Sequence, residues 1–168
     1  RYGIQQPFFL YVGNAKEHKN VQMLIDAYAQ TSASDVSTAS VSNALVLVTG
    51  GKEADRLQLV DGVQILSNVS DADLPALYSA ATAFVTASHY EGFGLPVAEA
   101  QACGCPVIAT NGSAIPEVAD EWAMLIEPTV EAFAAALQNP PQRTHGTSAK
   151  QLSWKDAAKQ HSRILHSL

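Results

Sequence analysis

The sequence is poor in the residues that several classes of protein require. Only 10 of its 168 residues are Lys or Arg, against 16 Asp or Glu, so the formal net charge is -6 and the isoelectric point is near 5.2. Because nucleic acids and anionic membranes are bound through clustered positive charge, this composition argues against both as partners. Charged residues make up only 15%, whereas 47% are apolar, which is typical of one globular domain with a substantial core.

Cysteine is nearly absent, and long apolar runs are missing. Cys103 and Cys105 are too close in the chain to form an unstrained disulfide, and no second Cys/His cluster offers metal ligands. We therefore interpret both as small core residues. No apolar run is long enough to span a membrane, and no signal peptide is apparent. Because the chain begins at Arg1 without Met, we expect it to be part of a longer protein.

Apolar runs alternate with amphipathic segments along the chain. The runs predict buried strands over 8–12, 45–48, 63–66, 83–86, 106–109 and 123–126, and helical spacing predicts helices over 21–29, 74–81, 96–103, 130–137 and 154–165. The segment Thr31–Asn43, rich in Ser, Thr and Ala, is predicted as a surface loop. This alternation predicts a single doubly wound α/β domain with a parallel sheet, which binds ligands at the carboxyl ends of its strands.

The common ligand-binding fingerprints are absent from the expected loops. The loop GNAKEHKN at 13–20 lacks the G-x-G-x-x-G pattern of dinucleotide-binding folds. The loop GGKEAD at 50–55 lacks the Ser or Thr and the upstream glycine of a nucleotide-hydrolase P-loop. No G-x-S-x-G occurs, which excludes a hydrolase nucleophile elbow.

The stretch HYEGFGLPVAE at 89–99 is the most informative segment that the sequence does contain. Pro96 suits the first position of a helix, so Gly92 to Leu95 is predicted to form a glycine-rich turn at a helix N-terminus. The free N–H groups and the helix dipole of such a turn suit a phosphate or diphosphate.

Two carboxylates flank this predicted anion site. Glu99 would repel a phosphate but could accept hydrogen bonds from a ribose diol, and Glu91 could accept them from a second hydroxylated group. A diphosphate with a ribose at one end and a hydroxylated group at the other is a nucleotide sugar. The alternative interpretation is a purely structural turn with two solvated acids.

The segment EGFGLPVAEA at 91–100 resembles the signature of the retaining group 1 (family 4) glycosyltransferases. Three further segments, at 8–20, 69–88 and 99–120, resemble other parts of the same family in the same order. The resemblance implies the GT-B fold, in which two Rossmann-like domains face each other across a cleft. Residues 1–168 would be the C-terminal, donor-binding half with a six-stranded parallel sheet, and the N-terminal acceptor domain would be absent from this chain.

The resemblance also implies roles for individual residues. Glu91 and Lys19 match the catalytic positions: Glu91 would contact hydroxyls of the donor sugar, and Lys19 would neutralise the donor diphosphate. Glu99 would hold the ribose. The other donor-binding positions are in the two loops: Gly13, Asn14, Gly92, Phe93, Gly94 and Leu95.

One position departs from the family pattern. Asn14 stands where many members have Arg, so Lys16 or His18 would have to supply the missing charge. The segment Asn68–Asp71 with Leu74 would contact the base. His89 and Tyr90 would line the donor site or would be exposed loop residues.

By resemblance, the reaction is transfer of a hexosyl group from a nucleotide diphosphate sugar to an acceptor hydroxyl. The loop that begins Gly13-Asn14 and ends His18-Lys19-Asn20 resembles that of some mannosyl- and rhamnosyltransferases of sugar polymers, which leaves the donor sugar open and makes GDP-mannose one candidate. The configuration would be retained and the product would be a polysaccharide or glycolipid. No metal and no cofactor are implied. The acceptor, a sugar or a lipid-linked sugar, would bind the missing N-terminal domain, so the isolated chain would be inactive. The complete enzyme would be cytoplasmic, and any membrane contact would be made by the missing half. The alternatives are another GT-B enzyme of the epimerase or phosphorylase type and a non-catalytic remnant, which Asn14 would allow.

Overall fold

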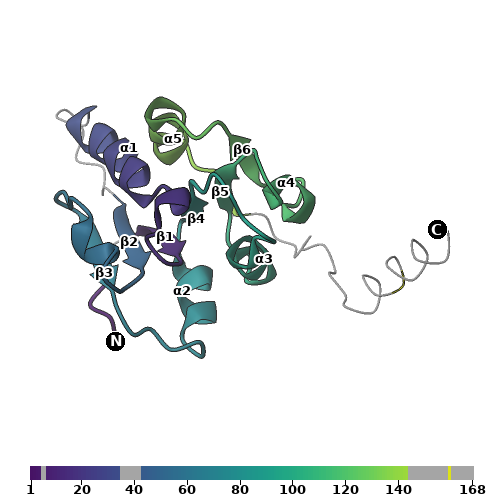
Figure 1. The fold of residues 1–168 in the computed structure, drawn as a ribbon, viewed down its shortest axis with the longest axis horizontal. Helices are drawn as coiled ribbons and strands as arrows, with labels where there is room; N and C mark the ends of the chain where they lie inside the picture. The colour runs from purple at the N-terminus through teal and green to yellow at the C-terminus, as the bar shows by residue number, and fades with distance from the viewer. Residues whose placement is uncertain (5–6, 35–42, 144–158, 160–168) are drawn as a thin grey trace.

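A six-stranded sheet in which every strand pair is parallel lies at the centre of the protein (Figure 1). The computed structural model describes residues 1–4, 7–34, 43–143 and 159. The strands are β1 Phe8–Val12, β2 Ala44–Val48, β3 Val63–Leu66, β4 Ala83–Thr86, β5 Val107–Thr110 and β6 Met124–Ile126. All six begin and end within one residue of the predicted bounds, and the predicted α/β class with a parallel six-stranded sheet is confirmed.

Helices cover both faces of this sheet (Figure 1). They are α1 Val21–Ser34, α2 Leu74–Ala80, α3 Leu95–Ala102, α4 Ile115–Val118 and α5 Val130–Gln138, with short 3-10 helices at Glu17–Lys19 and Ala54–Arg56. Leu24 of α1 and Phe133 of α5 belong to one buried cluster, whereas Tyr78 of α2 and Val97 of α3 belong to the other. The sheet is therefore doubly wound, with α1 and α5 on one face and α2, α3 and α4 on the other.

Alternate residues of each strand enter opposite clusters, because successive side chains in a strand point to opposite faces. In the central strand β1, Leu10 packs under α2 and α3, while Phe9 and Tyr11 pack under α1 and α5. Both faces carry a buried apolar cluster, so a central strand with polar residues at every second position would leave unpaired groups in one core. This is why the strands read as continuous apolar runs.

The structure corrects the predicted end of α1 and the predicted start of α3. Thr31–Ser34 was predicted as the start of a loop but forms the last turn of α1, where the Thr31 hydroxyl donates to the Tyr28 carbonyl at 2.7 Å. The Thr31 hydroxyl thus bonds the backbone of the preceding turn, so this residue is accommodated within the helix. Helix α3 begins at Leu95, one residue before the predicted Pro96. The rest of the predicted loop and, apart from Lys159, the predicted final helix lie outside the described residues.

The strand order β3-β2-β1-β4-β5-β6 reverses direction between β1 and β4. At such a point the loops after the two strands diverge and leave a crevice at the carboxyl edge of the sheet, where ligands of this fold class bind. The loop after β1 at 13–20 and the loop after β4 at 87–94 border this crevice.

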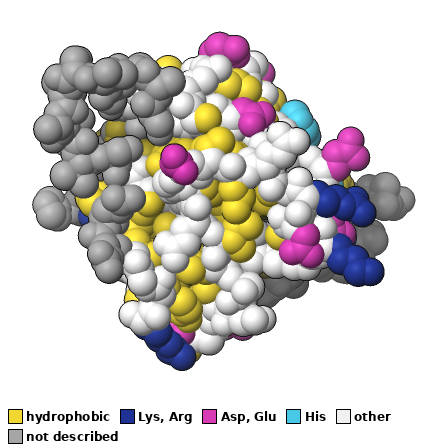
Figure 2. All heavy atoms as spheres, turned by 90° about the vertical axis from the view of Figure 1, so that its left-hand side faces the viewer, with side chains coloured by type: hydrophobic (Ala, Val, Ile, Leu, Met, Phe, Trp, Pro, Cys, Tyr) yellow, Lys and Arg dark blue, Asp and Glu magenta, His cyan; other side chains and the backbone are white. Residues whose placement is uncertain are grey.

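Two properties of the outer surface bear on partners. On the face shown in Figure 2, acidic side chains are interspersed with a few basic ones, and no basic patch is gathered among the described residues there. None of the described helices combines the length and the apolar character needed to cross a bilayer.

Candidate functional site

An ion pair joins the two loops at the switch point. The Lys19 ammonium lies 2.7 Å from Glu91 Oε2, and the two side chains are only 16% and 12% exposed. The backbone supports the same junction, since the His89 N–H donates to the His18 carbonyl at 2.8 Å. The structure therefore brings together the two residues predicted as catalytic, which are 72 positions apart in the chain.

Lys19 is the last residue of the short 3-10 helix Glu17–Lys19, which is capped by Asn20. Asn20 has a left-handed backbone (φ 53°) and its carbonyl accepts from the Leu24 N–H at 3.4 Å, so the chain turns directly from the 3-10 helix into α1. Asn is one of the few residues that tolerate this conformation. Asn20 thus directs the end of the loop after β1 towards Glu91.

Glu91 is oriented by two serines that the sequence analysis did not single out. Ser88 Oγ donates to Glu91 Oε1 at 2.8 Å and lies 3.2 Å from Thr86 Oγ1. Ser113 Oγ, in the loop after β5, accepts from the Glu91 N–H at 3.0 Å and donates to the Glu91 carbonyl at 2.8 Å. Ser88 could have been suspected from its position three residues before Glu91. Ser113 had no sequence signal, because its contact depends on β4 and β5 being neighbours.

The glycine-rich turn forms as predicted and opens onto α3. Gly94 has φ 90° and directly precedes the helix, whose first two residues are Leu95 and Pro96. Among the described residues, no group accepts a hydrogen bond from the N–H groups of Gly92, Phe93, Gly94 or Leu95. Unpaired N–H groups at a helix N-terminus attract anions, because they add to the positive end of the helix dipole.

The two glycines of this turn give a matched stability test. Gly94→Ala is expected to lower the free energy of unfolding by about 1–2 kcal/mol, because a Cβ is strained at φ 90°. Gly92→Ala should change it by less than about 0.5 kcal/mol, because its Cβ would meet nothing within 4 Å and its φ is not positive. Urea unfolding at unchanged m-value measures both, and equal losses would contradict this account of the turn.

Gly13 and Asn14 begin the loop after β1. The Gly13 N–H donates to the Val48 carbonyl at 3.1 Å, and a Cβ on Gly13 would lie 2.9 Å from the Tyr11 hydroxyl, so only glycine fits. That hydroxyl donates to the Asn14 carbonyl at 2.7 Å, and Asn14 Oδ1 accepts from the Lys16 N–H at 3.2 Å. The exposed Asn14 side chain therefore stabilises its own loop, as Asn does in turns. The Tyr11 phenol that bonds this loop has a raised pKa, first because it is buried and then because of the charge of Glu91.

Glu99 belongs to a different group of contacts. It is exposed on α3, and its Oε2 accepts a hydrogen bond of 2.9 Å from the hydroxyl of Tyr78 on α2. Between the two helices is a hollow of about 440 Å³ lined by Asp71, Leu74, Pro75, Tyr78, Glu99, Ala102 and Cys103. The predicted base-contacting residues Asp71 and Leu74 are thus beside Glu99. No hydrogen bond connects the Glu91 group with the Glu99 group among the described residues.

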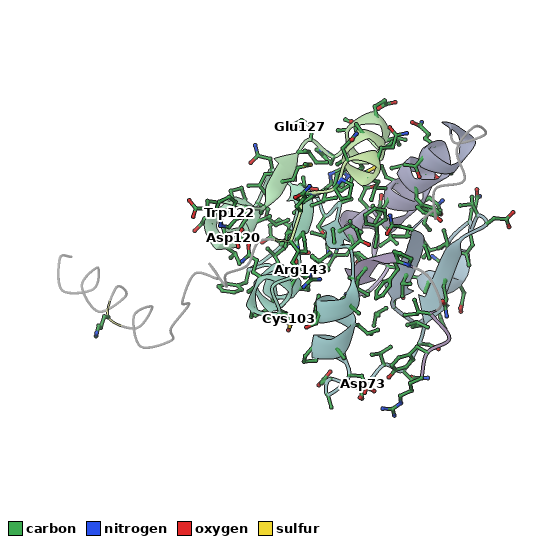
Figure 3. The ribbon with its side chains drawn as sticks, turned by 180° about the vertical axis from the view of Figure 1, so that it is seen from behind. Asp73, Cys103, Asp120, Trp122, Glu127 and Arg143 are labelled. Carbon is green, nitrogen blue, oxygen red and sulfur yellow. The ribbon has the colours of Figure 1, made fainter. Side chains whose placement is uncertain are left out.

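The cysteines are free, but only one of them is a core residue. Cys105 is buried, and this burial raises the pKa of its thiol to about 11. Cys103 is only partly buried and lies at the end of α3 beside α2 (Figure 3). Burial and the neighbouring Glu99 raise the pKa of the Cys103 thiol. The prediction of two core cysteines is therefore right for Cys105 and wrong for Cys103, which lines the hollow.

No group of three or more His, Cys, Asp or Glu in the described part of the chain is arranged to hold a metal ion. The expectation that no metal is needed relied partly on the absence of an Asp-x-Asp motif, and that premise is wrong, because Asp71-Ala72-Asp73 has this spacing. In the structure the Asp73 carboxylate is bonded to Arg1 at 2.8 Å, to the Tyr2 hydroxyl at 2.6 Å and to Ser70 Oγ at 2.7 Å. These bonds lower the pKa of Asp73, and the hydrogen bond from the Tyr2 hydroxyl contributes most to this shift. They also fasten the start of the chain to the start of α2.

Arg143 fastens the far ends of α2 and α3 together. Its guanidinium donates to the Gly104 carbonyl and to the Ala81 carbonyl, each at 2.8 Å (Figure 3). The turns that follow α2 and α3 are thus held side by side at the edge of the sheet opposite the crevice.

Comparison with known proteins decides the family. Residues 3–161 match the family model described as "Glycosyl transferases group 1". The chain belongs to this family. It is 36% identical over 172 residues to an O-antigen chain mannosyltransferase B of Escherichia coli, covering 92% of this chain and 44% of that protein. It is 32% identical over 147 residues to an O-antigen chain mannosyltransferase of Salmonella typhimurium, covering 82% and 39%.

Structural comparison agrees with the sequence match. The fold matches a sucrose-phosphate synthase from Thermosynechococcus elongatus with a TM-score of 0.72 and 25% identity, covering 97% of this chain and 45% of that one. The glycosyltransferase resemblance inferred from the sequence, with a domain of the GT-B type, is therefore confirmed. The chain spans less than half the length of each of these three proteins.

Proposed function

We propose that residues 1–168 form the donor-binding domain of a retaining hexosyltransferase and bind a nucleotide diphosphate sugar in the crevice between β1 and β4. The observation that carries this proposal is the placement of the Lys19–Glu91 pair at 2.7 Å next to a helix N-terminus with unpaired N–H groups. A cation and several N–H donors suit the diphosphate, while Glu91 and Glu99 suit hydroxyl groups at its two ends.

In this proposal the ion pair is exchanged when the donor binds. The diphosphate takes the Lys19 ammonium as its partner, which leaves Glu91 Oε2 free to accept a hydroxyl of the sugar. Ser88 and Ser113 keep Glu91 in place during the exchange, because their bonds do not involve Lys19. As the bond between sugar and diphosphate breaks, negative charge grows on the leaving phosphate, and Lys19 and the N–H groups of the turn stabilise it.

The acceptor hydroxyl would attack from the same face of the sugar, giving retention, and would pass its proton to the departing phosphate. Lys19 and the helix N-terminus supply the positive charge, so the scheme needs neither a metal nor a cofactor. The acceptor, a sugar or a lipid-linked sugar, would be held by an N-terminal domain outside this chain. In the complete protein we place the reaction in the cytoplasm, with any membrane contact made by that other domain.

Both curated relatives described above are named as O-antigen chain mannosyltransferases. This supports GDP-mannose as donor and a cell-surface polysaccharide as product. The donor sugar is proposed on the relatives' names, whereas the diphosphate and ribose contacts are proposed on the geometry of this chain.

Calorimetric titration of the chain with GDP, UDP, ADP and dTDP tests the proposal. We expect GDP to bind most tightly, and a nucleotide present at a hundred times its Kd should add about 2.7 kcal/mol to the free energy of unfolding. Glu99→Ala should weaken binding about 10- to 100-fold, because it removes hydrogen bonds to a charged acceptor. Glu121→Ala, which removes an exposed acid elsewhere, is the control.

The outcomes separate the parts of the proposal. Binding of another nucleotide in place of GDP, still weakened by Glu99→Ala, would keep the site and overturn the mannose assignment. Binding that is unaffected by Glu99→Ala would remove the ribose role of Glu99. Absence of binding by all four nucleotides would contradict donor binding by this chain.

A further inference from the structure

Tyr78 is a buried residue, and the one polar atom of its side chain contacts the candidate site. Its side chain is 1% exposed, and its hydroxyl donates to Glu99 Oε2 at 2.9 Å. A buried phenol loses its bonds to water and needs a protein partner. Here the partner is the carboxylate of an exposed residue, so a group anchored in the core holds a group on the surface.

The core determines where the Tyr78 hydroxyl lies. The ring packs edge-to-face against Phe84 of β4, with centroids 5.7 Å apart and planes at 63°. It belongs to the same buried cluster as Leu77 and Val97. Because the ring of this α2 residue is packed against β4 and belongs to the same buried cluster as Val97 of α3, the hydroxyl has little freedom to follow Glu99, and Glu99 instead takes the orientation that the hydroxyl imposes.

We propose that Tyr78 is a positioning residue that holds the Glu99 carboxylate ready to accept the two neighbouring hydroxyls of a ribose. This inference rests on the proposed function and adds a residue to it. An ionised carboxylate has about four acceptor sites on its two oxygens, and Tyr78 uses one of those on Oε2. Within the described part of the chain nothing else bonds this carboxylate, so Oε1 and the second site of Oε2 remain for the diol. Without Tyr78 an exposed glutamate samples many rotamers, and binding must then select one of them.

The direction of the hydrogen bond is set by protonation. Burial first, and then the charge of Glu99, raise the pKa of Tyr78, so the phenol keeps its proton at neutral pH. A protonated phenol facing an ionised carboxylate can only donate to it. The bond is therefore present under the conditions in which a nucleotide would bind.

The surroundings of the pair suit a nucleoside. The hollow of about 440 Å³ beside Glu99 has walls formed by Leu74 and Pro75 and a polar side formed by Asp71. This size is in the range of small-molecule sites, and apolar walls with few polar groups are typical of them. A ribose on Glu99 would place its base against these walls.

The test compares ribonucleotides with nucleotides that lack the diol. The affinities of GDP, UDP and their 2′,3′-dideoxy forms are measured by calorimetry on the wild type and on Tyr78→Phe, which removes one oxygen atom and keeps the ring. We expect the ribonucleotide that binds the wild type to bind Tyr78→Phe about tenfold more weakly. The dideoxy form should change by less than about twofold, because it makes no bond to Glu99.

Two further variants make the result specific. Tyr28→Phe removes the hydroxyl of another buried tyrosine and should leave all affinities unchanged. Tyr28 lies in α1, and its hydroxyl donates to the Asn43 carbonyl at a distance of 3.0 Å. In a Glu99→Gln background, Tyr78→Phe should have much less effect, because the carboxylate that it positions is gone.

The inference and the proposed function fail in different ways. Equal weakening of ribo and dideoxy forms by Tyr78→Phe, or no weakening of either, would overturn the role of Tyr78 and leave donor binding intact. If the wild type binds none of GDP, UDP, ADP and dTDP, donor binding itself is wrong, and the role of Tyr78 is wrong with it.

Discussion

Replacing Lys19 by Met is expected to weaken the binding of a nucleoside diphosphate by about 100-fold, because the cation facing the diphosphate is lost. It should also lower the free energy of unfolding by about 1–3 kcal/mol. The Glu91 side chain is only 12% exposed, and without Lys19 the only side chain left among the described residues that donates to its carboxylate is Ser88. Removing one partner from a fully buried ion pair lowers the free energy of unfolding by more than this. The Lys19–Glu91 pair is partly exposed, so water screens the charge left on Glu91 and the loss is smaller.

A second substitution separates the two consequences of losing Lys19. Adding Glu91→Gln to Lys19→Met removes the uncompensated charge, so stability should return towards that of the wild type while diphosphate binding stays weak. Lys52→Met, which removes an exposed cation from the loop after β2, should change affinity by less than about threefold. Calorimetry gives the affinities and urea unfolding the stabilities. Wild-type affinity in Lys19→Met would show that the diphosphate is bound elsewhere.

Replacing Phe84 by Ala is expected to lower the free energy of unfolding by about 3–5 kcal/mol, which is a large part of the total for a domain of this size. Phe84 is 0% exposed in β4 and packs edge-to-face on Tyr78, so its removal leaves a cavity under α2. Phe93→Ala removes the same atoms at a position that is 44% exposed and should cost less than about 1 kcal/mol.

Phe84 also connects the core with the site. In Phe84→Ala the ring of Tyr78 loses its neighbour, so the hydroxyl that bonds Glu99 is less well held and nucleotide affinity should fall as well. Phe84→Leu fills part of the space and should fall between Phe84→Ala and the wild type in stability. Equal stability losses in Phe84→Ala and Phe93→Ala, measured by urea unfolding, would contradict the packing described here.

The elements of the fold could be predicted because their signals are local. Most of the strands are short apolar runs, since a strand of a sheet covered on both faces has no polar side. The edge strand β3 differs, because it carries Gln64, whose side chain donates to the Tyr2 carbonyl. The start of α3 was marked by Gly94 and Pro96, which suit a left-handed turn and the first turn of a helix. The helical turn at Thr31–Ser34 was missed because Ser and Thr favour loops in isolation, whereas Thr31 here bonds the backbone of α1.

The sequence by itself therefore determined the strands, the doubly wound class and the identity of the loop residues, and it showed the family through segments spread along the chain. Tertiary structure alone decided which side chains meet. Lys19 reaches Glu91 across 72 positions, Ser113 reaches it across 22, and Tyr78 reaches Glu99 across 21. Parallel strands are joined by crossovers that run over a face of the sheet, so the carboxyl ends that meet at one edge belong to distant parts of the chain. Periodicity describes which face a residue occupies, but only the order and register of the strands bring two such faces into contact.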